Sequence, residues 1–234
     1  MPAILDTTLR EGELYKRFGS ETRAKLAECL AEVGVDRIEL TVDYPPRTTQ
    51  RDVEVVLEVL RSYDVEVVLH GRAYRRDVEA AAKYDVEGIG VYLAPTEIHR
   101  RFKLGGIGFE EARRRLIEAL DFAKSYGFRY RRATVEDASR YYFGEDGGLE
   151  TLAGLVEDLG EAGATVVSVP DTCGSLTPPQ ARDFFQKLRS TCKTPLSAHF
   201  HNDYGYASAN TVEAALAGAA ELHVSILGIG DRNG

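Results

Sequence analysis

Two histidines stand two residues apart near the C-terminal end of the chain, in the segment PLSAHFHND at residues 195–203. If this segment is a strand, its side chains alternate between two faces, so His199 and His201 point the same way. Two imidazoles with a common target are what a divalent metal ion needs. A chance pair of packed core histidines would have the same spacing, so the pair alone leaves both interpretations open.

A cluster of charged side chains follows the first apolar segment of the chain. Residues 3–9 (AILDTTL) predict a short strand, and Arg10 and Glu11 come directly after it, just before Gly12. Charged residues just past the C-terminal end of a strand mark the active-site face of a barrel enzyme. An ordinary solvated turn would also produce such a cluster.

The composition predicts one soluble, mildly acidic globular domain over residues 1–234, with 44% hydrophobic residues and a net charge of -8. The acidic balance gives no reason to expect nucleic acid as a partner. No apolar run approaches the roughly 20 residues of a membrane span, and no basic and apolar leader opens the chain. Three scattered cysteines form no disulfide framework, which predicts a cytoplasmic protein.

The chain alternates apolar strand patterns with amphipathic helix patterns and shows no linker. The predicted strands cover residues 3–9, 37–42, 66–70, 88–93, 130–135, 166–170, 196–201 and 223–227. The predicted helices include residues 20–33, 51–63, 108–126, 149–162, 177–191 and 207–218. Eight strands that alternate with helices predict an α/β fold, a (β/α)8 TIM barrel in which no helix follows the eighth strand.

A barrel is favoured over an open doubly wound sheet because polar residues stand at the ends of nearly all the strands, whereas an open sheet concentrates its site at one switch point. The glycines of residues 228–230 follow the last strand with no helix after them, so they do not form a dinucleotide-binding loop. In a barrel the polar strand ends converge on one mouth: Arg10, Glu11, Glu39, Thr41, His70, Arg132, Thr134, Glu136, Asp171, Thr172, His199 and His201.

The fifth predicted strand carries three polar residues at a spacing of two, Arg132, Thr134 and Glu136. If one of them faces the barrel axis, all three do. An exposed polar strand would have the same pattern, but a strand of a barrel has no solvent-exposed face. Given the barrel, the trio therefore indicates a functional site.

Four motifs stand along the chain: LDTTLREGE at residues 5–13, VPDTCG at 169–174, HFHND at 199–203 and LGIGDRNG at 227–234. In this order they resemble the catalytic barrel of the DRE-TIM metallolyase superfamily. Its members include isopropylmalate, citramalate and homocitrate synthases and hydroxymethylglutaryl-CoA lyase. The chain most resembles the homocitrate synthases, because Glu11 follows the arginine and because Arg132, Thr134 and Glu136 match that enzyme's arginine, serine and glutamate.

The resemblance implies a divalent metal held by Glu11, His199 and His201, a ligand set that suits zinc, manganese, magnesium or ferrous iron. The metal would act as a Lewis acid on the ketone of a 2-oxo acid. Arg10 would stabilise the negative charge on the acetyl-CoA enolate and the new alkoxide. The resemblance therefore implies acetyl-CoA and a 2-oxo acid as substrates, and an enzyme that is a dimer or larger.

The same resemblance assigns the selection of the oxo acid. Thr172 would hydrogen-bond the carboxylate beside the ketone. Arg132, helped by Thr134 and His70, would pair with a second, distal carboxylate and so select 2-oxoglutarate over a branched oxo acid. A branched oxo acid would leave Arg132 buried and unpaired.

Other polar residues receive supporting roles. Glu136 is expected to orient Arg10 or a water molecule. Asp6 lies within the predicted first strand and is expected to be structural. His223 opens the predicted last strand at the bottom of the barrel, where a packing role is expected, and Cys173 is expected to fill space.

The sequence thus predicts an acyltransferase of homocitrate-synthase type, which condenses acetyl-CoA with 2-oxoglutarate for lysine biosynthesis. Two alternatives stay open: a related isopropylmalate or citramalate synthase or an HMG-CoA-lyase-like enzyme, and a non-catalytic paralogue that keeps the oxo-acid pocket. Two features depart from the synthases, and the second of them, the missing lid region, motivates the non-catalytic alternative. Leu14 replaces their glutamine, and the sequence stops at Gly234, before their eighth helix and C-terminal lid extension.

Overall fold

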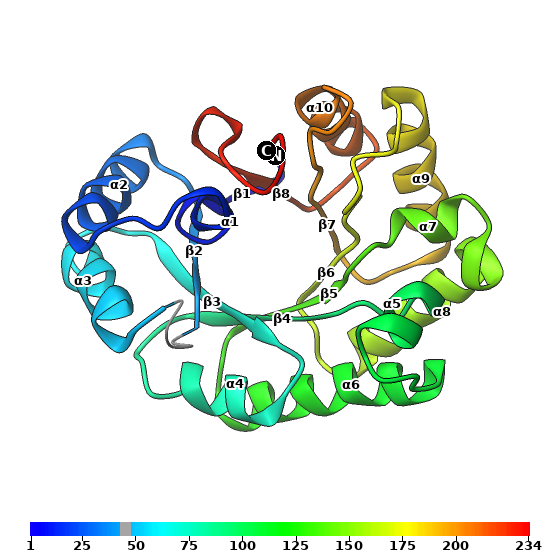
Figure 1. The fold of residues 1–234 in the computed structure, drawn as a ribbon, viewed down its shortest axis with the longest axis horizontal. Helices are drawn as coiled ribbons and strands as arrows, with labels where there is room; N and C mark the ends of the chain where they lie inside the picture. Colours follow the sequence, from blue (N-terminus) through cyan, green and yellow to red (C-terminus); the bar gives the residue numbers. More distant parts are fainter. Residues whose placement is uncertain (43–47) are drawn as a thin grey trace.

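The strands close into a parallel barrel in the order of the sequence, from β1 to β8 and back to β1, in the computed structural model, which describes residues 1–42 and 48–234. Figure 1 shows the helices around the outside of this barrel. The strands are Ala3–Asp6 (β1), Arg37–Thr41 (β2), Glu66–Arg72 (β3), Gly88–Leu93 (β4), Tyr130–Val135 (β5), Val166–Ser168 (β6), Leu196–Ala198 (β7) and Glu221–Val224 (β8). The predicted TIM barrel is therefore confirmed.

The α-helices are Thr8–Tyr15 (α1), Ser20–Val33 (α2), Gln50–Leu60 (α3), Arg75–Ala81 (α4), Glu97–Phe102 (α5), Phe109–Ser125 (α6), Ser139–Tyr142 (α7), Gly148–Glu161 (α8), Pro178–Thr191 (α9) and Ala207–Leu216 (α10). Six of them, α2, α3, α6, α8, α9 and α10, begin and end within a few residues of the predicted helical patterns, and four shorter helices are additional. Two 3-10 helices add Glu145–Gly147 (η1) and Ile226–Gly228 (η2). Within the described residues, no α-helix follows β8, and none has the length and apolar character needed to cross a bilayer.

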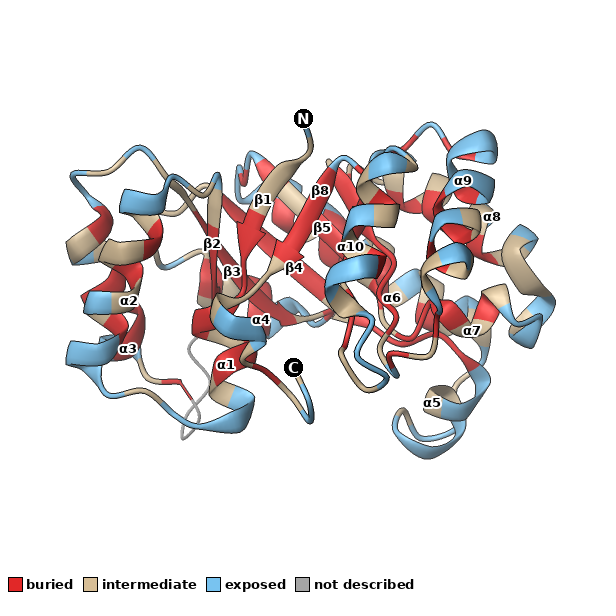
Figure 2. Ribbon diagram, turned by 90° about the horizontal axis from the view of Figure 1, so that it is seen from above, coloured by how far each residue is buried: buried red, intermediate tan, exposed pale blue. Residues whose placement is uncertain are grey.

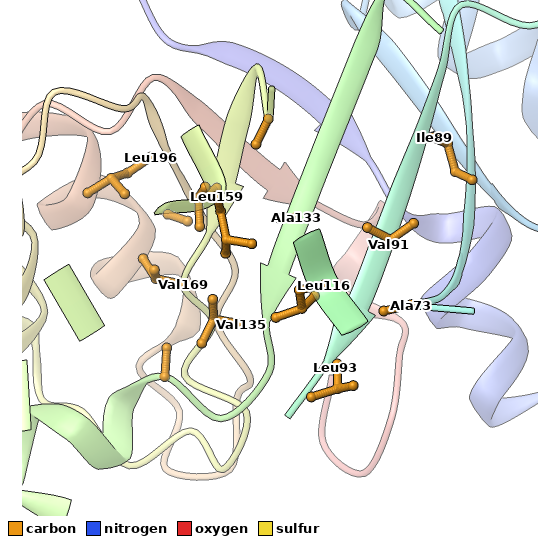
Figure 3. Packing of buried hydrophobic residues seen from close by; sticks show 14 of the residues in the cluster. Ala73, Ile89, Val91, Leu93, Leu116, Ala133, Val135, Leu159, Val169 and Leu196 are labelled. Atoms are coloured by element: carbon orange, nitrogen blue, oxygen red, sulfur yellow. The ribbon is translucent and has the colours of Figure 1, made fainter. Parts of the chain in front are cut away.

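The core lies between the outer faces of the strands and the inner faces of the helices. Figure 2 shows the strands as buried and the outward faces of the helices as exposed. In Figure 3, Leu116 of α6 lies over strands β4 and β5, near Val91 and Ala133, and all three side chains are fully buried. This continuous apolar layer fixes the strands, and the strands in turn fix the side chains that point into the barrel.

Six of the predicted strands have other bounds in the structure, and in β1, β7 and β8 the difference moves functional residues. The carboxylate of Asp6 accepts a hydrogen bond from the backbone N–H of Thr8 at 2.8 Å, which ends β1 and lets α1 begin at Thr8. Strand β7 ends at Ala198, before the two histidines. Strand β8 begins at Glu221, two residues earlier than predicted, so the expectation that His223 opens it is wrong.

Candidate active site

The nine residues predicted to form the site all line one cavity of about 520 Å³ at the C-terminal ends of the strands. They come from α1, β3, β5 and the segments that follow β5, β6 and β7. Barrel topology brings them together because parallel strands all end at one mouth. The nine are Arg10, Glu11, His70, Arg132, Thr134, Glu136, Thr172, His199 and His201.

Three of these residues form a compact cluster of metal-ligand type. The ligand atoms of Glu11, His199 and His201 lie within 4.8 Å of one another. The two Nε2 atoms are 3.3 Å apart, and His199 Nε2 lies 3.7 Å from Glu11 Oε1. Burial lowers the pKa of both histidines, so each is neutral and keeps a lone pair for a cation.

The carboxylate of Glu11 also fits a metal ion. One oxygen, Oε1, forms an ion pair with the Arg10 guanidinium. The other, Oε2, is buried and has no hydrogen-bond partner among the described residues. A buried carboxylate oxygen without a donor is costly unless a cation satisfies it. Two imidazoles and one carboxylate therefore fit a divalent metal with open coordination positions.

A buried carboxylate, Glu39 of β2, joins two arginines beside this cluster. The Arg10 Nε donates to Glu39 Oε2 at 2.5 Å, and Arg132 pairs with the other oxygen, Oε1. Although burial alone would raise it, the two guanidinium groups hold the pKa of Glu39 well below its usual range. The carboxylate is therefore ionised and orients both arginines.

Arg132 reaches this position because strand β4 has a glycine opposite it. A Cβ atom at Gly90 would lie 2.5 Å from Arg132 Nη2, so the guanidinium would have to move away from its present partners. The same Nη2 lies 2.9 Å from His70 Nδ1, which can accept a hydrogen bond only as a neutral imidazole. Burial lowers the pKa of His70 well below its usual value and keeps it neutral. The His70 ring stacks on Tyr92, with ring centroids 4.8 Å apart.

One expectation about this part of the site is wrong, and a second is wrong in one of its two alternatives. Arg132 has Glu39 as a partner, so a branched oxo acid would not leave it unpaired. Glu136 does not orient Arg10; both its oxygens accept from Lys103 Nζ at 3.0 Å, because the end of β5 directs it toward the segment after α5. Thr172, in contrast, lies in the pocket as expected, and its hydroxyl oxygen accepts from the backbone N–H of Asp137 at 2.8 Å.

The sequence assigned no catalytic or binding role to three residues of this region: Glu39, Lys103 and His223. Glu39 interrupts an apolar strand and could have been assigned a buried partner from that pattern. His223 is not a packing residue at the bottom of the barrel; it lines the pocket, and its Nδ1 lies 3.2 Å from Nδ1 of His199. The correct strand start would have found it, since Glu221 and His223 then share the inner face.

The model of one protein family, described as HMGL-like, matches residues 1–234. The chain is 37% identical to the probable 2-isopropylmalate synthase of Ignicoccus hospitalis, over 99% of this chain and 56% of that protein. It is 32% identical to the homocitrate synthase of Sulfolobus acidocaldarius, over 99% of this chain and 49% of that protein. It is also 32% identical to the (R)-citramalate synthase of Methanocaldococcus jannaschii, over 100% of this chain and 46% of that protein.

The chain spans about half the length of these curated relatives. Among solved structures, the HMG-CoA lyase of Bacillus subtilis superposes with a TM-score of 0.84 at 23% identity, over 99% of this chain and 80% of that chain. This similarity shows a shared barrel fold. The curated relatives are more similar in sequence, at 32–37% identity, than this solved structure at 23%.

Proposed function

The chain belongs to the HMGL-like family, and on that premise we propose that its barrel is the metal-dependent catalytic domain of a synthase that condenses acetyl-CoA with a 2-oxo acid. The observation that carries the proposal is the cluster of Glu11, His199 and His201 beside Arg10 in one pocket. Relatives named as isopropylmalate, homocitrate and citramalate synthases support the same class of reaction.

Each residue around the cluster has a task that its contacts support. A divalent cation at the cluster would polarise the ketone of the oxo acid. Arg10 carries a fixed positive charge beside Glu11 and stabilises the oxygen that becomes negative when the acetyl carbon attacks the ketone carbon. The Thr172 hydroxyl accepts from Asp137, which leaves its proton for the carboxylate next to the ketone.

The charge balance of the pocket favours a dicarboxylic oxo acid, with 2-oxoglutarate as the proposed substrate. Beside the metal-ligand cluster, two guanidinium groups, Arg10 and Arg132, form ion pairs with two carboxylates, Glu11 and Glu39, so these four charges cancel. A divalent metal would leave two positive charges. A dianionic substrate neutralises both, whereas a monoanion leaves one charge uncompensated in a largely buried site.

The test is thermal unfolding of the Mn²⁺-loaded protein and of an EDTA-treated control with 2-oxoglutarate, oxaloacetate, pyruvate and 2-oxoisovalerate. A ligand at 100 times its Kd adds about 2.7 kcal/mol of stability, which a thermal shift detects. We expect the largest shift with 2-oxoglutarate and no shift after EDTA treatment. Greater stabilisation by pyruvate or 2-oxoisovalerate would contradict the substrate, and no metal-dependent shift with any acid would contradict the function.

Two arginine variants test the distal carboxylate. Arg132→Met removes the guanidinium at the floor of the pocket, and it should abolish the preference for 2-oxoglutarate over pyruvate. Arg129→Met changes an exposed arginine just before β5 and serves as the matched control. An unchanged preference in Arg132→Met would contradict the assigned role.

A further inference from the structure

Three side chains, His199, His223 and Glu221, form a hydrogen-bonded line from the metal-ligand cluster into the barrel. His199 Nδ1 lies 3.2 Å from His223 Nδ1, and His223 Nε2 lies 3.1 Å from Glu221 Oε1. His223 and Glu221 are 7% and 3% exposed, so neither has water as its main partner. The line leads away from Nε2 of His199, the atom that faces Glu11 and His201.

The chemistry of these groups fixes where each proton sits. The Glu221 carboxylate only accepts, so His223 Nε2 carries the proton and donates it. In a neutral imidazole the other nitrogen is then an acceptor, so His223 Nδ1 accepts from His199 Nδ1–H. His199 is left with an unprotonated Nε2, and its lone pair points at the metal-ligand cluster.

Arg132 opposes this arrangement weakly. Its Nη1 lies 3.4 Å from His223 Nε2, and a guanidinium only donates, so on its own it would favour an unprotonated Nε2. That tautomer would place the Nε2 lone pair against the carboxylate of Glu221 at 3.1 Å, with no proton between them. Arg132 also has Glu39 and Thr134 as partners, whereas Glu221 is the carboxylate that faces His223. The contact to Glu221 therefore decides the tautomer.

Glu221 is itself held from the opposite side. Its Oε1 also accepts from the Tyr130 hydroxyl at 2.8 Å, and its Oε2 accepts from Arg37 Nη1 at 3.1 Å. Tyr130, Arg37 and Glu221 lie on β5, β2 and β8. His199 lies one residue past the end of β7, and its backbone carbonyl accepts a hydrogen bond from the Asp171 N–H at 3.0 Å. That backbone contact does not fix the imidazole ring, whereas residues on three strands hold the carboxylate at the far end of the line.

We propose that His223 is a positioning residue for the metal ligand His199, and that Glu221 sets its tautomer. The inference rests on the metal site of the proposed function. Partners of this kind orient a metal-binding histidine and raise its basicity, and their loss typically costs about 10–100-fold in metal affinity.

The experiment measures zinc affinity by competition with a chromogenic chelator. His223→Leu removes the acceptor for His199 Nδ1–H, and it should weaken zinc binding about 10–100-fold. His223→Asn has nearly the same shape as the leucine variant but places an oxygen near the former Nδ1, so its affinity should stay within a few-fold of the parent protein. Equal affinity in the leucine variant and the parent would overturn the proposal, as would equal losses in both variants.

A spectroscopic measurement on the unsubstituted protein needs no variant to fold. In ¹⁵N spectra of the zinc-loaded protein, we expect His199 to be protonated on Nδ1 and His223 on Nε2. A His223 proton on Nδ1 would overturn the proposal. Failure of the metal site itself looks different: the parent protein would then bind no zinc, or His199→Ala would bind it as well as the parent.

Discussion

Glu39 and Arg132 form an ion pair at the floor of the pocket, and their side chains are 0% and 1% exposed. The residues are 93 positions apart in the sequence and meet across the barrel interior. Arg10 shares the same carboxylate at 2.5 Å. The arginine proposed to bind the substrate and the arginine proposed to act in the reaction are therefore positioned by one buried residue.

Glu39→Gln should destabilise the protein by about 3–5 kcal/mol, because removing one partner leaves buried charges without compensation. The full difference in unfolding free energy between the two proteins should be present at neutral pH. The pKa of Glu39 lies well below its usual value of 4.5 in the folded protein. The ion pairs of Glu39 therefore stabilise the protein fully above about pH 4.5, and this stabilisation is lost as the pH falls below that value toward the lowered pKa. Urea unfolding of both proteins between pH 3.5 and pH 7 measures the difference.

Glu66→Gln is the matched control for that experiment. Glu66 also pairs with an arginine, Arg37, but its side chain is 42% exposed. Its removal should cost less than about 1 kcal/mol. Equal losses in the two variants would contradict a special role for the buried pair.

Gly90→Ala should displace Arg132, because the new methyl group would meet Nη2 at 2.5 Å. We expect a loss of about 1–3 kcal/mol in unfolding free energy and weaker stabilisation by 2-oxoglutarate. Gly154→Ala on α8 is the control, since its Cβ meets no atom within 4 Å. That change should stabilise the protein by about 0.5–1 kcal/mol, the usual gain for alanine in a helix. If Gly90→Ala changed neither the unfolding free energy nor the stabilisation by 2-oxoglutarate, Arg132 would have more room than its contacts indicate.

Asp6→Asn should stabilise the protein increasingly as the pH rises. Burial raises the pKa of Asp6 to about 6, so ionising it in the folded state costs free energy at neutral pH. This cost is absent well below pH 3.8 and complete above about pH 6. Asparagine keeps an oxygen for the Thr8 N–H, so the gap between the two proteins should widen by about 1 kcal/mol from pH 5 to pH 8. Chemical unfolding at both pH values measures it, and a constant gap would contradict the account.

The elements and the mouth of the barrel were predictable because they follow from local patterns. Apolar runs and helical spacing gave eight strands in the right order, and the four motifs pointed to the right family. The convergence of Arg10, Thr172 and His199 followed from topology alone, since parallel strands end at one face. These inferences needed no knowledge of which side chains touch.

The pairings inside the barrel were not predictable in this way. Whether Arg132 is paired with Glu39 depends on the width of the barrel and on the missing side chain at Gly90, neither of which leaves a periodic signal. His223 was misplaced because a two-residue error in the start of β8 moved it from the interior to the bottom. The turn that Asp6 closes likewise depends on one side-chain contact.

The central claim is that Glu11, His199 and His201 bind a divalent metal. The most direct test is calorimetric titration of the metal-free protein with Zn²⁺, with His201→Asn as the ligand variant and His99→Asn as a control histidine outside the cluster. We predict one zinc per chain, retained in His99→Asn and weakened by more than about 100-fold in His201→Asn, since losing a ligand costs more than losing its partner. Zinc binding that is absent from the parent protein, or unchanged in His201→Asn, would contradict the account.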